Sequence, residues 1–306
     1  MSKLAFIFPG QGSQYSGMGK DFYDAYEEAK NVYEMANEAT DVDVKEICFG
    51  TDEKINQTEY TQIAMFTTEM AILEVIKNKG LKPDVCAGLS LGEYGALYLA
   101  GVLPLDKLMY LVRKRGIYMQ DAYPVGGAMT AVIGMEPDVV EKACDETEGI
   151  VKVANYNCPG QLVISGEEEA VKKAMEKLSE AGARRLIPLN VSGPFHTELL
   201  KAASEKLTEE MEKLEFTNPV IPYYSNVEAT LITEADGIKE ILAKQMISSV
   251  CFWQSIKKMI EDGVDTFVEI GPGKSLSGFV KRINKEVKVI NIDKVADLEK
   301  LEEITC

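Results

Sequence analysis

A serine flanked by two glycines stands where an apolar run gives way to a helix-like stretch. The run is Val85-Cys86-Ala87, the serine lies in Gly88-Leu89-Ser90-Leu91-Gly92, and the helix-like stretch covers residues 93–100. The glycines let the chain turn tightly and hold the serine oxygen clear of the surface. This order of strand, sharp turn and helix is that of a nucleophile elbow, so it predicts an α/β fold with Ser90 as a nucleophile. The alternative is a loop serine that caps the helix after it.

Strands and helices alternate along the rest of the chain as well, which favours a parallel sheet covered on both faces. A first buried strand is expected at residues 3–8, and a second one leads into Ser90. Helical stretches are expected across residues 18–79, the longest of them from Thr61 to Lys79, and again at 105–120. Later strands are expected at residues 220–224, 265–270 and 287–290.

The stretch 124–189 has a different character. Its expected elements are a strand, a helix, two strands, a helix and a strand, at residues 128–134, 137–146, 150–154, 161–165, 167–181 and 185–189. The two middle strands flank an Asn-x-Asn-x-Pro-Gly turn. This order is the ferredoxin-like split motif. We therefore expect an α/β hydrolase-like large domain, residues 1–123 and 190–306, whose mostly parallel sheet is flanked by helices, with an inserted ferredoxin-like α+β subdomain, residues 124–189.

Composition excludes several functions. The 306 residues include 33 basic and 49 acidic side chains, for a net charge of −16, which argues against general nucleic-acid binding because that needs a positive field. The six cysteines show no CxxC pairing, which indicates reduced thiols in a cytoplasmic protein. No apolar run approaches a membrane span, and the first residues lack a signal-peptide pattern. One histidine and scattered cysteines cannot supply the usual zinc ligands, so no metal site is expected.

His196 is the only histidine of the sequence. A serine hydroxyl becomes a good nucleophile when a neighbouring base takes its proton, and the ordinary histidine pKa of about 6.5 suits that task. If an imidazole activates Ser90, His196 must therefore supply it. It lies in a Gly-Pro loop just beyond the 124–189 stretch. The alternative is a purely structural histidine.

A glycine-rich loop, Gly10-Gln11-Gly12, follows the first strand. Such a turn can aim a backbone N–H at a developing oxyanion, alongside the N–H of Leu91. The rival interpretation is nucleotide binding, and two patterns argue against it. Tyr15 stands where the dinucleotide fingerprint has its third glycine. Val268 stands where a phosphate-binding loop ending in Gly273-Lys274-Ser275 would have its first glycine.

Two arginines, Arg113 and Arg115, lie in an otherwise apolar helical stretch. Positions two apart differ by about 200° around a helix, so these side chains cannot share a face. One of them can therefore point inward, although a charge run is usually a solvated face. A buried guanidinium requires an anion and grips a carboxylate with two parallel hydrogen bonds. Beside an acylated serine it would select an acyl group that carries its own carboxylate.

Five motifs follow one another along almost the whole chain. They are Phe8-Pro9-Gly10-Gln11-Gly12-Ser13-Gln14, Gly88-Leu89-Ser90-Leu91-Gly92-Glu93-Tyr94, Arg115-Gly116, Gly193-Pro194-Phe195-His196 and Glu269-Ile270-Gly271-Pro272-Gly273-Lys274. This ordered set resembles the malonyl-CoA:acyl carrier protein transacylase family of fatty-acid synthesis, and the resemblance includes the inserted ferredoxin-like unit. One departure is Leu89, where many members have a histidine. It leaves the nucleophile, the base and the carboxylate clamp intact.

The resemblance implies catalytic roles for five residues. It makes Ser90 the acyl-accepting nucleophile and His196 its base. The backbone N–H groups of Gln11 and Leu91 would form the oxyanion hole. Gln245 is similar to the family glutamine whose backbone carbonyl orients the histidine in place of a triad acid.

Four further residues are implied to bind the substrate. Arg115 would bind the malonyl carboxylate. Phe195 resembles the Phe-His of malonyl-selecting polyketide acyltransferases, where a bulky ring leaves little room for a methyl branch. Asn155 and Asn157 match a pocket-lining Asn-x-Asn stretch.

The implied activity is transfer of a malonyl group from malonyl-CoA to the phosphopantetheine thiol of acyl carrier protein, through a malonyl-serine intermediate and without a cofactor. Carriers of this pathway are acidic, so docking needs a basic patch. The cluster that we name comprises Lys274, Lys281, Arg282 and Lys285; a solvated helix face is the alternative. The rival functions are a serine hydrolase or thioesterase, which would release free acid, and a non-catalytic scaffold partner of a biosynthetic complex.

Overall fold

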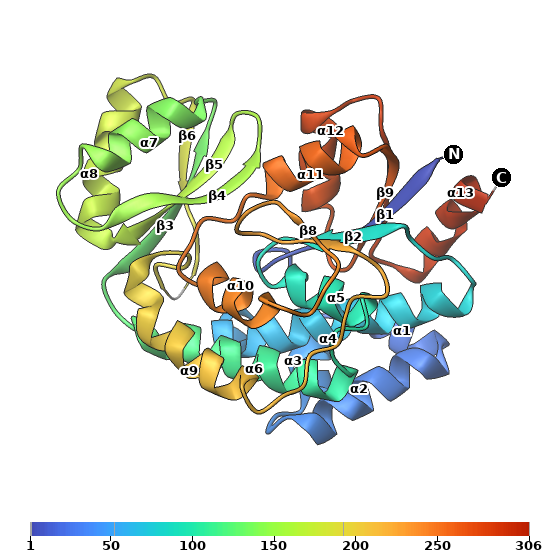
Figure 1. Cartoon of the computed structure of the whole chain (residues 1–306). Coiled ribbons are helices and arrows are strands. Elements are labelled where there is room, and N and C mark those ends of the chain that lie inside the picture. Colours follow the sequence, from blue (N-terminus) through green and yellow to red (C-terminus); the bar gives the residue numbers. More distant parts are fainter. Residues whose placement is uncertain (1, 52, 192, 306) are drawn as a thin grey trace.

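The computed structural model describes residues 2–51, 53–191 and 193–305, and its strands form two separate sheets (Figure 1). The larger sheet has six strands in the order β10-β9-β1-β2-β7-β8. Neighbouring strands are parallel except β8, which pairs antiparallel with β7. Their bounds are β1 Lys3–Phe8, β2 Val85–Gly88, β7 Tyr223–Tyr224, β8 Leu231–Ile232, β9 Val264–Ile270 and β10 Lys288–Ile292. The expected α/β fold with a mostly parallel sheet is confirmed.

Strand β1 lies inside this sheet, and its side chains supply both faces. Phe6 and Phe8 join the large apolar cluster on one face, whereas Ala5 and Ile7 join a second cluster on the other. Successive side chains of a strand point to opposite faces, so a strand covered on both sides must be apolar throughout. This explains the uninterrupted apolar run of residues 4–8.

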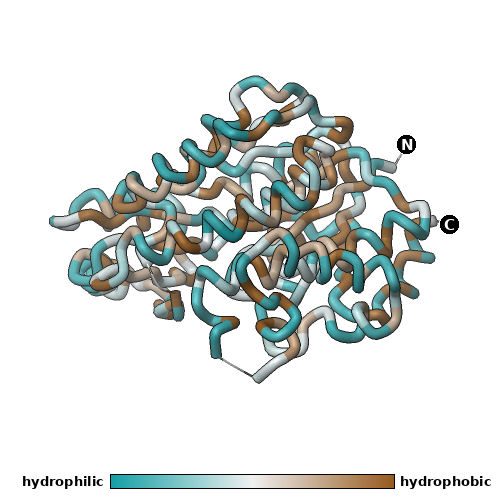
Figure 2. The backbone as a smooth tube through the Cα atoms, turned by 90° about the horizontal axis from the view of Figure 1, so that it is seen from below, coloured by the Kyte–Doolittle hydropathy of each residue, from teal (hydrophilic) through white to brown (hydrophobic). Residues whose placement is uncertain are grey.

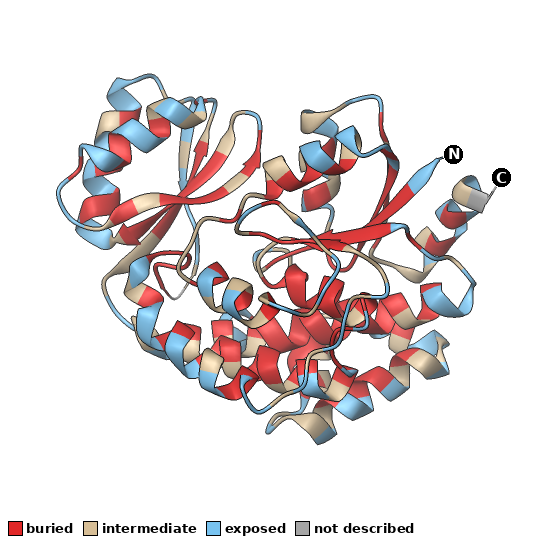
Figure 3. Cartoon of the chain, viewed as in Figure 1, coloured by how far each residue is buried: buried red, intermediate tan, exposed pale blue. Residues whose placement is uncertain are grey.

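Helices cover both faces of the large sheet (Figure 1). The first face carries the long helix α4, Thr58–Asn78, which packs between α2, Glu27–Ala39, and α6, Leu105–Ala122. The second face carries α11, Phe252–Glu261, and α12, Ser275–Ile283. Helix α4 is buried almost all round, whereas the outer side of α2 is exposed (Figure 3). The expected helices at 61–79 and 105–120 are thus present, and α4 begins three residues earlier, at Thr58.

The other helices of this part of the chain are shorter than α2, α4 and α6. They are α1 Lys20–Ala25, α3 Val44–Phe49, α5 Gly92–Leu99, α9 Lys201–Met211, α10 Ile238–Gln245 and α13 Glu302–Thr305, together with 3-10 helices at Glu53–Asn56, Glu198–Leu200 and Val295–Leu301. Hydrophilic and hydrophobic residues alternate along the outer helices (Figure 2). This alternation places one apolar side against the core and one polar side in water.

The smaller sheet is wholly antiparallel, in the order β4-β5-β3-β6. Its elements are β3 Gly127–Ile133, α7 Pro137–Asp145, β4 Val151–Cys158, β5 Gln161–Glu167, α8 Glu168–Glu180 and β6 Arg185–Pro188. Helices α7 and α8 pack on one face of it. Met129, Ala131 and Val163 on the opposite face join the large cluster of the main core. The expected β-α-β-β-α-β order is confirmed, while the division into a domain of residues 1–123 and 190–306 and a subdomain of 124–189 stays a prediction.

Most expected strands differ from the structure by one or two residues at an end, and two differ by more. Strand β4 does not end at Ala154 but runs to Cys158, so Asn155 and Asn157 lie in the strand and not in a turn. The strand runs this far because it stays paired with β5 up to Cys158. Val250 joins its other side, where the Val250 N–H donates to the Ala154 carbonyl and the Tyr156 N–H donates to the Val250 carbonyl. The strand expected at 220–224 contains only Tyr223–Tyr224, and β8 was not expected at all. Strands of two residues are too short to show a periodic pattern.

Three general expectations can be compared with the described residues. None of their helices combines the length and apolar character needed to cross a bilayer. The five cysteines among them, Cys48, Cys86, Cys144, Cys158 and Cys251, are free thiols, and Cys306 lies outside the described residues. The same residues contain no group of three or more histidine, cysteine or acidic side chains placed to hold a metal ion.

Candidate active site

Ser90 lies in a strained turn between β2 and α5. Its φ is 53°, in the left-handed region that non-glycine residues rarely adopt. The turn requires the neighbouring glycines, because a Cβ on Gly88 would lie 1.9 Å from the backbone carbon of Gly92. A Cβ on Gly92 would in turn lie 2.1 Å from the carbonyl oxygen of Phe8. The predicted nucleophile elbow is therefore present, with the hydroxyl presented at the carboxyl end of the central strands.

His196 lies beside this hydroxyl. Its Nε2 is 2.9 Å from Ser90 Oγ, and its Nδ1 is 2.8 Å from the backbone carbonyl oxygen of Gln245. The carbonyl can only accept, so Nδ1 carries the proton and Nε2 is free to accept the proton of Ser90. Burial, and then the positive charge of Arg115, lower the pKa of His196 to about 4. The imidazole is thus neutral near pH 7, in the form that a general base needs. Ser192, in the same loop, lies outside the described residues.

Two loops supply backbone N–H groups near Ser90. Gln11 follows β1, Leu91 precedes α5, and both line the cavity that contains Ser90 and His196. In the described part of the chain neither N–H donates a hydrogen bond to another residue. The N–H of Ser90 itself is occupied, because it donates to Asn226 Oδ1 at 2.6 Å. The two N–H groups predicted for an oxyanion hole thus have no such partner and belong to residues that line the same cavity as Ser90.

The structure decides between the two arginines of α6. Arg113 pairs with Asp41 and Glu59, away from Ser90. Arg115 is 1% exposed, and none of the carboxylates in the described part of the chain forms a salt bridge or hydrogen bond with it. Its Nη2 donates to Ser90 Oγ at 3.0 Å and to Gln245 Oε1 at 2.9 Å, and its Nη1 donates to Gln62 Oε1 at 2.7 Å. Arg115 is thus a buried cation with neutral hydrogen-bond acceptors, next to the Ser90 hydroxyl.

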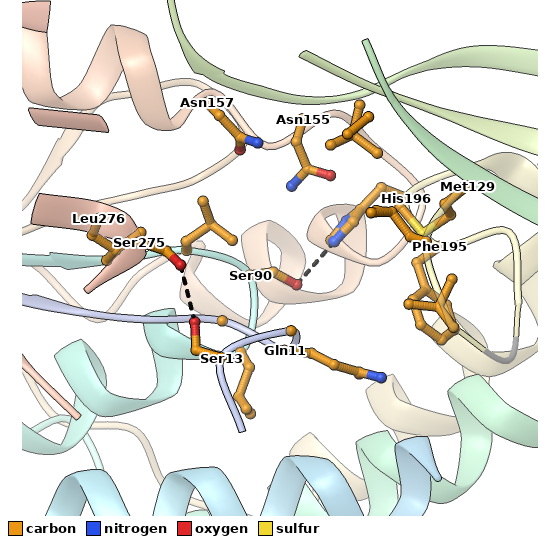
Figure 4. A pocket seen from close by; sticks show the side chains of 18 of the residues that line it. Gln11, Ser13, Ser90, Met129, Asn155, Asn157, Phe195, His196, Ser275 and Leu276 are labelled. Carbon is orange, nitrogen blue, oxygen red and sulfur yellow. Dashed lines mark hydrogen bonds between the residues drawn. The ribbon is translucent and has the colours of Figure 1, made fainter. Parts of the chain in front are cut away.

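A cavity of about 300 Å³ opens above these groups (Figure 4). Part of its wall is apolar and includes Met119, Met129 and Phe195, which is 5% exposed. Its other side is polar, where Asn155 and Asn157 of β4 lie opposite Ser13 and Ser275 (Figure 4). All nine site residues predicted from the sequence lie at this cavity except Gln245, which lies behind it and contacts His196 and Arg115.

Three residues of the site were not predicted. Asn226 Nδ2 donates to the Gly88 carbonyl at 2.6 Å, so its side chain bridges both sides of the Ser90 turn. Glu93 accepts a hydrogen bond from Gln245 Nε2 at 2.6 Å. Gln62 accepts from Arg115, and a buried amide in the apolar helix α4 is the one sequence signal that could have drawn attention to it. Nothing local to Asn226 or Glu93 indicates these contacts, because their partners are distant in sequence.

The predicted basic patch lies on and around α12, whose first residues Ser275 and Leu276 line the cavity. Lys274, Lys281, Arg282 and Lys285 are all exposed. Lys281 donates to the carbonyl of Val287, and Arg282 donates to Gln161 Oε1 at 2.8 Å. Their function in docking stays a prediction.

Comparison with known proteins gives consistent matches over nearly the whole chain. Residues 5–300 match the family model described as the acyl transferase domain. The malonyl CoA-acyl carrier protein transacylase of Bacillus subtilis is 47% identical over 304 residues, which are 98% of this chain and 96% of that protein. The crystal structure of the malonyl CoA-acyl carrier protein transacylase from Clostridium perfringens has a TM-score of 0.95 and 47% identity, covering 99% of this chain and 97% of that one.

A further solved structure contains a partner. It is a malonyl-transacylase in complex with its type II polyketide synthase acyl-carrier protein, with a TM-score of 0.96 and 37% identity, covering 99% of this chain and 100% of that one.

Proposed function

This chain belongs to the acyl transferase family, as a malonyl CoA-acyl carrier protein transacylase, and we propose that Ser90, His196 and Arg115 carry its reaction. It is an acyl carrier protein S-malonyltransferase of fatty-acid synthesis, with malonyl-CoA and acyl carrier protein as partners. One observation supports the residue roles above all others. Ser90 Oγ lies between a base, His196 Nε2 at 2.9 Å, and a cation, Arg115 Nη2 at 3.0 Å.

In the first half-reaction His196 Nε2 takes the hydroxyl proton while Ser90 Oγ attacks the thioester carbonyl of malonyl-CoA. The tetrahedral intermediate collapses, the carbon–sulfur bond breaks, and the proton passes from His196 to the CoA thiolate. The Gln245 carbonyl accepts from Nδ1 throughout, so it keeps the ring oriented while Nε2 carries the proton. The product is a malonyl ester on Ser90.

The oxyanion of the tetrahedral intermediate accepts hydrogen bonds from the backbone N–H groups of Gln11 and Leu91. Such a donor is typically worth about 3–4 kcal/mol in the transition state. Leu91 directly precedes α5, Gly92–Leu99, so the positive end of that helix dipole adds to the field at the same place.

Arg115 selects the acyl group. The malonyl carboxylate replaces Ser90 Oγ as an acceptor for the guanidinium, and a charged pair in a buried site is much stronger than the neutral contact that it replaces. An acetyl group offers no such partner. Phe195 and Met129 line the same cavity, and the bulky Phe195 ring is expected to disfavour a methyl branch on the acyl group.

The second half-reaction reverses these steps with a different thiol. The phosphopantetheine thiol of the carrier gives its proton to His196 and attacks the ester carbonyl. The Ser90–carbon bond then breaks, and the proton returns to Ser90 Oγ. The malonyl group leaves on the carrier as a thioester, as in other ping-pong transfers.

No step of this scheme needs a redox or metal group, so we propose that the enzyme uses no cofactor beyond the acyl thioester. We also propose a cytoplasmic location, which the five free cysteines support because disulfides are rare in that compartment. Unchanged transfer after treatment with a chelator is the expected result.

The test is incubation with malonyl-CoA, with and without phosphopantetheinylated carrier protein, followed by intact mass. We expect a malonyl adduct on the wild type, its transfer to the carrier, and no adduct on Ser90→Ala. An adduct that persists in Ser90→Ala contradicts the nucleophile assignment. Rapid release of free malonate without a carrier would instead favour a thioesterase, and no labelling of Ser90 by a fluorophosphonate would favour a non-catalytic scaffold.

A further inference from the structure

Glu93 is a buried carboxyl directly behind the catalytic groups. It lies one residue after Gly92 in α5 and is 0% exposed. Its carboxylate accepts from Gln245 Nε2 at 2.6 Å and from the backbone N–H of Asn226 at 3.3 Å and 3.4 Å. It contacts neither Ser90 Oγ nor the cavity, so the reaction scheme above does not use it.

Its partner Gln245 contacts Ser90, His196 and Arg115. The backbone carbonyl of Gln245 orients His196, its Oε1 accepts from Arg115 at 2.9 Å, and its Nε2 donates to the Ser90 carbonyl at 2.9 Å. A side-chain amide has one accepting end and one donating end of nearly equal shape. Arg115 can only donate, so the amide supports Arg115 only when its oxygen faces the guanidinium.

We propose that Glu93 is the positioning residue that fixes the orientation of the Gln245 amide and, through it, holds Arg115 ready for the malonyl carboxylate. This inference rests on the proposed function. A carboxylate can only accept, so it draws the NH₂ end of Gln245 toward itself and leaves the oxygen for Arg115. The short charge-assisted bond is the strongest of the contacts to that NH₂ group.

Charge supports the same assignment. The three acceptors around Arg115 are neutral, and Glu93 supplies a balancing negative charge one amide away. The other titratable groups that face Glu93 are Tyr94 of its own helix, Tyr223 of β7 and, beyond it, Cys86 of β2. Burial raises the pKa of all three, so they stay neutral, and among the residues that the structure describes Arg115 is the cation whose charge acts on the carboxylate.

The pKa of Glu93 lies close to neutral pH. Burial raises its pKa to about 7, and the hydrogen bonds from Gln245 and Asn226 and the charge of Arg115 oppose that rise. The carboxylate is therefore present above pH 7 and takes up a proton below it. His196 loses its basic form only near pH 4. We therefore expect the protonation of Glu93 and that of His196 to lower the rate in two separate pH ranges.

The experiment follows Ser90 acylation by intact mass with malonyl-CoA and with acetyl-CoA, in wild type, Glu93→Gln and Glu93→Asp. In Glu93→Gln an amide NH₂ competes with the donors around it, and we expect kcat/KM for malonyl-CoA to fall about 10- to 100-fold. We expect acetylation and fluorophosphonate labelling of Ser90 to change less than about threefold, because the Ser90–His196 pair stays intact. Glu93→Asp keeps the charge and should recover part of the malonyl rate.

Glu69→Gln is the matched control. Glu69 is also a fully buried carboxyl on a helix, in α4, and neither of its oxygens has a hydrogen-bond partner among the described residues. We expect the malonyl and acetyl rates of this variant to match those of the wild type.

The pH profile of kcat/KM tests the same proposal in the wild type. In the wild type we expect kcat/KM for malonyl-CoA to decrease below pH 7, whereas kcat/KM for acetyl-CoA should not decrease in that range. In Glu93→Gln the decrease of kcat/KM for malonyl-CoA should be absent. Equal losses of malonylation, acetylation and labelling in Glu93→Gln would indicate a merely structural role and overturn the proposal, as would a wild-type malonyl profile without the decrease below pH 7. Failure of the proposed function looks different, because the wild type would then form no malonyl adduct at all, and this inference would fall with it.

Discussion

Nδ1 of His196 donates its hydrogen bond to the backbone carbonyl of Gln245, at 2.8 Å, where a serine triad would place a carboxylate. A carbonyl orients the ring as a carboxylate does, but it carries no full negative charge to stabilise an imidazolium. Arg115 adds a positive charge on the other side of Ser90. Both features favour the neutral ring.

This arrangement predicts the pH dependence of Ser90 reactivity. Because the pKa of His196 is lowered to about 4, the base stays unprotonated as pH falls through the ordinary histidine range. We expect the rate of fluorophosphonate labelling to stay constant from pH 8 to about pH 5.5, well above that pKa. A labelling midpoint near pH 6.5 would contradict the assigned environment of the ring. His196→Ala provides the baseline for unassisted labelling.

Arginine geometry at position 115 predicts the acyl specificity. Arg115→Lys keeps the charge but loses the planar fork, so we expect kcat/KM for malonyl-CoA to fall at least about tenfold and acetyl transfer to change little. Arg113→Lys, two positions away on α6, is the matched control and should leave both rates unchanged, because Arg113 pairs with Asp41 and Glu59 instead. The measurement is steady-state transfer with both thioesters. Equal losses of kcat/KM for malonyl-CoA in Arg115→Lys and Arg113→Lys would contradict the binding of the malonyl carboxylate by Arg115.

The glycines of the elbow predict an asymmetric response to alanine. Gly88→Ala places a Cβ against the backbone of Gly92, and we expect a loss of about 3 kcal/mol or more in the free energy of unfolding. Gly278→Ala, in α12, meets nothing within 4 Å and should add about 0.5–1 kcal/mol, because alanine has the higher helix propensity. Urea denaturation measures both. A Gly88→Ala protein as stable as the wild type would show that the turn is not as tight as described.

Asn226 predicts a link between stability and catalysis. Its side chain satisfies the N–H of Ser90 and the carbonyl of Gly88, so Asn226→Ala leaves two buried groups without partners. We expect a loss of about 2–4 kcal/mol in the free energy of unfolding and a lower kcat for malonyl transfer. Asn218→Ala, which removes a single exposed bond to the Ala235 N–H, is the control and should cost less than about 1 kcal/mol. Equal losses in the two variants would contradict a special role of Asn226.

The predicted basic patch can be separated from catalysis. Lys274 is exposed directly before Ser275 at the cavity rim, so Lys274→Glu should raise KM for the carrier protein by about threefold or more, an effect weakened by salt. Malonylation of Ser90 by malonyl-CoA should not change. Lys257→Glu, exposed on α11, controls for net charge. A carrier KM that is the same in all three proteins would exclude this docking patch.

The sequence by itself determined the local features of this protein. The glycines around Ser90 predicted the elbow because the turn depends on residues that are adjacent in the chain. The continuous apolar run of β1 predicted a buried strand, and the β-α-β-β-α-β order of the smaller sheet followed from alternating patterns. His196 was identified because the chain offers no other histidine.

Only the tertiary structure decided which polar groups meet. Helical spacing showed that Arg113 and Arg115 face apart. The acids that pair with Arg113 and the serine that contacts Arg115 come from other elements of the chain. Asn155 lies in a strand that pairs with the nearby β5, and only folding brings Val250, almost a hundred residues later, to its other side. Glu93 and Asn226 acquire their contacts in the same way. Periodicity records which side of an element is buried, whereas a hydrogen bond depends on the partner that folding brings to that side.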